Sequence, residues 1–184
     1  AAPRRIDLPA MSDDTTITVF DAVRALAFIG DLSMGQPTDH SLRTAWLAQQ
    51  IAERAGCGAP QVEVVRHVAL LRWSGCTANA QAFSDFLEDD VQGRRLLLAS
   101  RAPRMRQPNP HAPLPDAVLA MARIHCEIAG DLAQTLGLGA DTEAALRAVF
   151  EAYDGNGVPG VLQGGQVPLA TCIVALASDL EIFG

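Results

Sequence analysis

The sequence predicts an all-α domain, on three observations. Segments rich in helix-forming residues recur along the chain, with apolar residues at three- and four-residue spacing. Clusters of proline and glycine separate these segments, as expected at helix ends. No segment alternates apolar and polar residues for long enough to indicate a strand. The 184 residues suit one hydrophobic core, so we expect a single helical domain.

The N-terminal half contains three expected helices. Residues 1–16 are polar and interrupted by proline, which predicts a disordered or leader segment. The first helix should span residues 18–32 and, being apolar nearly throughout, should be largely buried. A second is expected over residues 40–55, with Asp39 as its N-cap. A third over residues 60–73 begins with proline in its first turn.

The rest of the chain alternates expected helices with loops. Two shorter helices are predicted over residues 77–87 and 90–99, followed by a proline- and arginine-rich loop over residues 100–116. A long helix over residues 114–136 carries His125 on its apolar stripe, so His125 should point inward. The final helices should begin at a capping Asp141 and at Leu169. The first of these has the predicted stripe Leu146, Val149, Phe150 and Tyr153.

Composition excludes several classes of function. All fourteen basic residues are arginine and the formal net charge is −7, which predicts no direct nucleic-acid binding. No window resembles a membrane span or a signal peptide, so we expect a cytoplasmic protein. The four cysteines are scattered without a CxxC pair, which favours reduced, mostly buried thiols.

Two histidines are candidates for chemistry. His40 opens the second expected helix and His125 lies inside the long one. Imidazoles from two helices can meet in a bundle core and ligate a metal ion. Each could equally be a core or cap histidine with a purely structural hydrogen bond.

The order of four motifs resembles a known family. They are "DHSLRTAWLAQQIAERAG", "VRHVALLRWSGC", "HCEIAGDLAQTLGL" and "VFEAYDGNGVPGVLQGGQVPLATCIVALASDLE". Together they resemble the HD superfamily of metal-dependent phosphohydrolases, and more narrowly the HD-GYP branch. Intact members of that branch hydrolyse cyclic di-GMP with two or three metal ions. The resemblance implies an HD-domain-like helical bundle over residues 17–184.

The same resemblance implies that most metal ligands are absent. His40 and His125 match two histidines of the family. Other residues stand at the remaining positions: Arg72 and Trp73 at the His-Asp pair, Cys76 at a lysine, Val149 and Phe150 at paired histidines, and Ser178 at an aspartate. Arginine and apolar residues cannot replace imidazole and carboxylate around bridged metal ions. We therefore expect the metal pocket to be apolar core or an apolar ligand pocket.

Degenerate domains of this kind resemble the N-terminal halves of actinobacterial LuxR-type transcription regulators. This implies a regulatory domain, with a helix-turn-helix beyond residue 184, that binds an unknown small molecule or forms a homodimer. The expected pocket comprises His40, Arg72, Trp73, Cys76, His125, Cys126 and Glu151. Arg72 could hold a phosphate or carboxylate and Trp73 could stack on a ring. Alternatively, Arg72 pairs with an acid such as Glu151 and Trp73 only packs.

Two other functions stay open. The first is a phosphohydrolase acting on cyclic di-GMP or a related phosphodiester, with an altered metal site that includes His40 and His125. In a variant of it, Cys76 or Cys126 beside the histidines binds zinc or haem iron, although we expect no cofactor. The second is a dimerisation domain without a ligand, which would associate through its last helix.

Overall fold

Helices make up the regular structure of the chain wherever the computed structural model describes it, which is over residues 16–79 and 116–184. Six are α-helices: α1 (Val19–Ser33), α2 (His40–Arg54), α3 (Ala59–Leu71), α7 (Asp116–Thr135), α8 (Ala140–Arg147) and α9 (Leu169–Phe183). Two are short 3₁₀ helices, η1 (Ser74–Asn79) and η2 (Gly164–Gln166). Within these ranges there is no strand, so the all-α prediction is confirmed.

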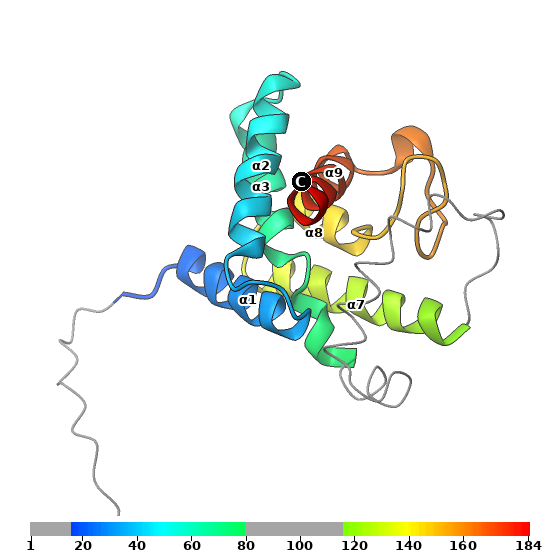
Figure 1. Cartoon of the computed structure of the whole chain (residues 1–184), viewed down its shortest axis with the longest axis horizontal. Helices are drawn as coiled ribbons and strands as arrows, with labels where there is room; N and C mark the ends of the chain where they lie inside the picture. Colours follow the sequence, from blue (N-terminus) through cyan, green and yellow to red (C-terminus); the bar gives the residue numbers. More distant parts are fainter. Residues whose placement is uncertain (1–15, 80–115) are drawn as a thin grey trace, which may run out of the picture.

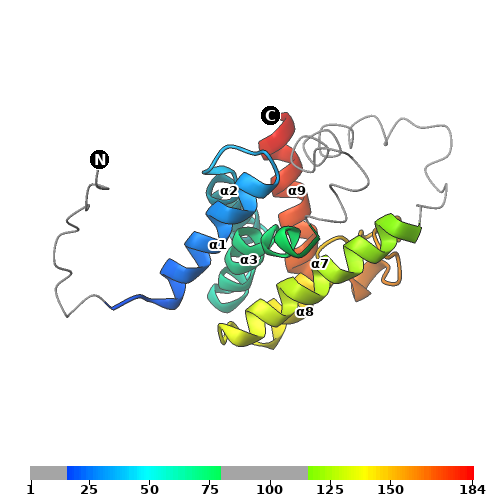
Figure 2. The same ribbon diagram turned by 90° about the horizontal axis from the view of Figure 1, so that it is seen from below.

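The helices form two packed groups joined through α3. In one group α2 and α3 lie side by side and α9 packs against both (Figure 1). In the other, α8 runs along α7, as the perpendicular view shows (Figure 2). The short helix η1 follows α3 and packs against α7 and α1. The turn between α3 and η1 therefore lies where the two groups meet.

Small residues let the helices approach closely in the core. Ala48 and Ala52 of α2, Ala129 and Ala133 of α7, and Ala177 of α9 are completely buried. Interaxial distances shrink when the contact residues are small. Larger side chains such as Leu71 and Leu146 fill the spaces between the helices. The core is therefore continuous across both groups.

Local sequence signals set several helix ends. Thr18 caps α1 and forms a capping box with Asp21. Helix α2 ends before Gly56, which has φ +81°, and α7 ends before Gly137, which has φ +67°. Glycine adopts this left-handed conformation without the steric cost that a Cβ brings. The predicted starts of α2 and α9 and the end of α9 agree with the structure. The other boundaries of the described α-helices lie within about two residues, except the end of α8.

Three local expectations are wrong. Helix α1 is not largely buried, because its outer side leaves Phe28, Ile29 and Leu32 exposed. Helix α8 is capped at Gly139, and Asp141 lies in its first turn instead. Because α8 ends at Arg147, Tyr153 falls outside it and is exposed. The predictions over residues 1–15, 80–99 and 100–115 lie outside the described residues.

Candidate functional site

The turn after α3 brings several predicted site residues together. Arg72 and Trp73 follow the last residue of α3, and Cys76 lies in η1. This turn packs tightly on α7, since a Cβ at Gly75 would lie 2.4 Å from the backbone oxygen of His125. Glycine is therefore required for η1 to approach α7 so closely. We call the residues Met34, Arg72, Trp73, Cys76, His125 and Phe150 the central cluster.

Arg72 is a charged residue buried at the centre of the domain. Its residue is 2% exposed, and its guanidinium carbon lies 4.7 Å from the centre of the Trp73 ring. The Nη1 atom donates a hydrogen bond of 3.2 Å to the backbone oxygen of Val174 in α9. The aromatic face and the carbonyl both favour the positive charge. Arg72 thus links α3 to α9 from inside the core.

His125 has a defined tautomer. Its Nε2 lies 2.7 Å from the backbone oxygen of Arg72, which can only accept a hydrogen bond. Nε2 therefore carries the proton, and Nδ1 presents a lone pair 3.6 Å from the sulfur of Cys76. The imidazole stacks against Phe150 with ring centres 4.6 Å apart. His125 points inward, as its place on the apolar stripe predicts.

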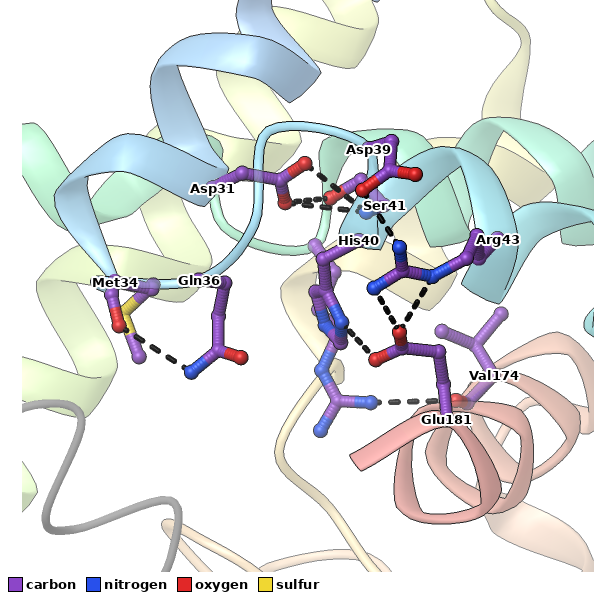
Figure 3. Close-up of polar contacts among 10 residues, drawn as sticks. Asp31, Met34, Gln36, Asp39, His40, Ser41, Arg43, Val174 and Glu181 are labelled. Carbon is purple, nitrogen blue, oxygen red and sulfur yellow. Dashed lines mark hydrogen bonds and ion pairs between the residues drawn. The ribbon is translucent and has the colours of Figure 1, made fainter. Parts of the chain in front are cut away.

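His40 belongs to a separate polar group between α2 and α9 (Figure 3). It is fully buried, and its Nδ1 pairs with Glu181 near the end of α9. Arg43 binds the same carboxylate through Nε at 2.7 Å and through Nη2 at 2.5 Å. Asp39 accepts a 2.7 Å hydrogen bond from Arg43, and its side chain does not cap α2. The pair between His40 and Glu181 therefore links the end of α9 to the start of α2.

A second buried carboxylate supports the start of α2. Asp31 is 1% exposed and accepts hydrogen bonds from the backbone nitrogen and the hydroxyl of Ser41. Burial raises the pKa of Asp31 above its ordinary value, and the two bonds from Ser41 only partly oppose this. Asp31 thus fixes the loop between α1 and α2 at the cost of burying a charge.

Cys126 and Glu151 have structural partners. Burial raises the pKa of the Cys126 thiol to about 11, although backbone N–H groups of Phe150 and Val149 donate to its sulfur. Such a thiol is protonated at neutral pH and unreactive. Glu151 accepts a 3.1 Å hydrogen bond from the backbone nitrogen of Val161. Its other oxygen has no hydrogen-bond partner among the described residues, so the suggested pair with Arg72 is not formed.

The loop "YDGNGVPG" is a compact corner beside the central cluster. Gly155 and Gly160 have φ of +81° and +78°, a region that favours glycine. Gly157 approaches the preceding chain so closely that a Cβ would lie 2.3 Å from the backbone nitrogen of Ala152. Glu151 holds the far side of the loop through Val161. The backbone frame of the motif is therefore intact.

The structure unites four of the seven predicted pocket residues, which are Arg72, Trp73, Cys76 and His125. The sequence analysis missed Met34, whose thioether sulfur lies 3.2 Å from the Cys76 sulfur, and Glu181, the partner of His40. Glu181 had one signal, as one of two acidic residues, with Asp179, in a largely apolar helix. Met34 had none, because its contact with Cys76 is created by the fold.

The described residues do not fit a pair of bridged divalent metal ions. They contain no group of three or more histidine, cysteine, aspartate or glutamate side chains placed to hold a metal. A guanidinium and the rings of Trp73 and Phe150 fill the centre. Divalent ions need several converging imidazole and carboxylate ligands, and a fixed positive charge opposes them.

Two surface cavities lie apart from the central cluster. One, of about 390 Å³, is lined by residues of α1 and the start of α2, among them Arg24, Asp31 and Leu42. The other, of about 380 Å³, lies between α2 and α3 beside Cys57. Neither contains a predicted pocket residue, so the pocket around Arg72 stays a prediction. Among the described helices, none is long and apolar enough to cross a membrane.

Comparison with known proteins places the fold. No family model matches the chain. The 3'3'-cGAMP-specific phosphodiesterase 3 of Vibrio cholerae serotype O1 is 19% identical over 181 residues, with 83% of this chain and 38% of that protein covered. A crystal structure of a cyclic GMP-AMP-specific phosphodiesterase from V. cholerae superposes with a TM-score of 0.66 and 19% identity. The match covers 88% of this chain and 40% of that one. It confirms the predicted HD-domain-like helical bundle.

Proposed function

We propose that this chain is a non-catalytic regulatory domain built on a phosphodiesterase fold. One observation carries the proposal: the side chains of Arg72 and Trp73 fill the centre of the domain, where the resemblance to HD phosphohydrolases places the metal-binding His-Asp pair. Both residues are nearly completely buried, and Arg72 is tied to the backbone of α9.

Electrostatics support the loss of catalysis. A guanidinium stays protonated at any physiological pH, so Arg72 cannot lose its charge to accommodate a metal ion. A fixed positive charge at this position disfavours a divalent ion close to it. His40 and His125 are present, but among the described residues they do not converge with further histidine, cysteine, aspartate or glutamate side chains to form a metal-binding group.

The regulatory role rests on the resemblance to the N-terminal halves of transcription regulators and on an exposed apolar stripe along α9. Leu169, Leu176, Leu180 and Phe183 share one face of α9 and are each about half exposed. Such a stripe commonly marks an interaction surface. In this proposal two cytoplasmic copies of the chain associate through the exposed stripe of α9. A small-molecule ligand would be a second regulatory signal. The acidic chain does not bind nucleic acid itself.

A cyclic-dinucleotide phosphodiesterase is the second candidate. It is favoured by the similarity in sequence and fold to the cyclic GMP-AMP phosphodiesterases. The chain spans about two-fifths of the length of those proteins, and the identity is 19%. On similarity alone this candidate is the stronger one, and the occupied centre of the domain is what opposes it.

Turnover measurements separate the two candidates. Purified protein is incubated with Mn²⁺ or Fe²⁺ and with 3'3'-cGAMP, cyclic di-GMP or a nitrophenyl phosphodiester. The matched control is the His40→Ala/His125→Ala double variant, which removes both remaining histidines of the family pattern. We expect hydrolysis by the two proteins to be equal and at background. Hydrolysis by the natural protein that the double variant loses would establish the phosphodiesterase instead.

A further inference from the structure

Three soft donor atoms converge in the central cluster. The sulfur of Cys76 lies 3.2 Å from the thioether sulfur of Met34 and 3.6 Å from Nδ1 of His125. The residues come from the end of α1, from η1 and from α7, and each is at most 6% exposed. Thiolate, thioether and imidazole together are a ligand set that selects soft metal ions.

The imidazole is already in the form that binds a metal. Because Nε2–H donates to the backbone oxygen of Arg72, the lone pair of Nδ1 points toward Cys76. Metal-binding histidines characteristically donate their other ring N–H to a carbonyl or carboxylate, which fixes the ring orientation. The site would therefore need no tautomer change.

The distances between the donor atoms suit a shared metal ion. An ion about 2.3 Å from sulfur and about 2.1 Å from nitrogen would make an angle of about 110° between Cys76 and His125, given their 3.6 Å separation. The angle between the two sulfurs would be about 90° at their 3.2 Å separation. The flexible Met34 side chain can open the second angle, since three torsions adjust its sulfur.

Charge decides the oxidation state of the ion. A monovalent ion on one thiolate and two neutral ligands gives a neutral site, which burial tolerates. A divalent ion on the same three ligands would leave a net positive charge in the core, which burial disfavours. The aromatic rings of Trp73 and Phe150 also pack against the imidazole of His125. These conditions favour a monovalent soft ion over zinc or haem iron.

We propose that Met34, Cys76 and His125 form a buried copper(I) site. Copper(I) displaces the Cys76 thiol proton, which passes to solvent, so the step forms one Cu–S(thiolate) bond without any change of oxidation state. The thioether and Nδ1 complete the coordination. The site is independent of whether the domain hydrolyses a phosphodiester.

The test is an anaerobic titration of the full chain with copper(I), using bicinchoninate as the competing chelator. The background protein is the Cys57→Ser/Cys172→Ser variant, because these half-buried thiols could bind copper adventitiously. We expect about one copper ion per chain, with two sulfur ligands and one nitrogen ligand by X-ray absorption. Adding Cys76→Ser should abolish this binding, and Met34→Leu should weaken it about tenfold or more.

Two controls keep the result interpretable. Cys126→Ser removes another buried thiol and should leave the copper stoichiometry unchanged. Because a core variant can fail to fold, circular dichroism must show native helicity for each protein before titration, and Met34→Leu preserves the apolar volume of its site. Copper binding that survives Cys76→Ser, or zinc that displaces copper(I) at equal concentration, would overturn the proposal.

Discussion

Arg72 is the residue on which the proposed non-catalytic role depends most. Its guanidinium lies over Trp73, bonds to Val174 in α9 and lies where the resemblance places a metal ligand. The sequence predicted it as a pocket residue, but its contact with Val174, 102 residues away, could not be predicted from the local pattern. For a single residue, the side-chain type determines the chemistry that is possible. The fold determines which other residues the side chain contacts.

Arg72→Ala should lower the free energy of unfolding by about 3 kcal/mol, because it leaves a cavity and removes the contacts to Trp73 and Val174. Arg66→Ala is the matched control. Its guanidinium also lies over a ring, at 5.2 Å from the centre of Phe20, but the side chain is 34% exposed, so we expect a loss below about 1 kcal/mol. Urea denaturation measures both. Equal losses would show that Arg72 is not a packed core residue.

Asp31→Asn tests the buried carboxylate. Since burial raises the pKa of Asp31, the folded state holds its proton more tightly than the unfolded chain. Folded stability therefore falls as pH rises from the ordinary aspartate pKa of about 3.9 through the raised value. Asparagine does not ionise, so the variant does not lose this stability. Its stability relative to the natural protein should therefore be unchanged in acid and increase toward neutral pH.

Melting temperatures across this pH range measure the effect, with Asp21→Asn as the contrast. A hydrogen bond from Thr18 lowers the pKa of Asp21, so its variant should lose stability near neutral pH and match the natural protein in acid. A constant difference between Asp31→Asn and the natural protein at every pH would refute the assignment of Asp31.

At the scale of single elements, the sequence specified helix type and position better than exposure. The glycine corner and the starts of α2 and α9 followed from the proline and glycine residues around them, which act locally. The burial of α1 did not, because apolar content alone cannot say which side meets another helix. The outer residues Phe28, Ile29 and Leu32 are exposed in the described structure.

Gly157→Ala should destabilise the corner after α8 by about 1–3 kcal/mol, because the new Cβ would overlap the backbone of Ala152. Gly165→Ala, in η2 of the same segment, has open space around the new atom and a φ outside the left-handed region. We expect this control to be neutral or slightly stabilising. Chemical denaturation measures the free energy of unfolding of both variants. If Gly157→Ala does not change this free energy, the backbone of the corner can move to accommodate a Cβ.

The exposed stripe on α9 predicts self-association. Leu176→Glu/Leu180→Glu places two charges on the stripe and should weaken a dimer at least about tenfold in sedimentation experiments. Val161→Glu is the control, because Val161 is an exposed apolar residue that is not part of α9. A natural protein that is monomeric at every concentration would contradict the proposed contact.

At the scale of the whole molecule, the sequence predicted the fold better than it predicted the site. The HD-domain-like bundle is shared with the cyclic GMP-AMP phosphodiesterase structure at a TM-score of 0.66. Motif order therefore predicted the architecture. The assembled site required contacts between distant segments: Met34 with Cys76, Arg72 with Val174, and His40 with Glu181. Such contacts leave no periodic signal in one sequence.

The residues at the centre of this domain should not hold a pair of divalent metal ions. Titration of the protein with Mn²⁺, followed by electron paramagnetic resonance of the free and bound ion, tests this most directly. We expect less than about 0.2 tightly bound Mn²⁺ per chain, because the described residues offer no converging ligands for a divalent site. Two Mn²⁺ per chain with magnetic coupling between them would contradict it.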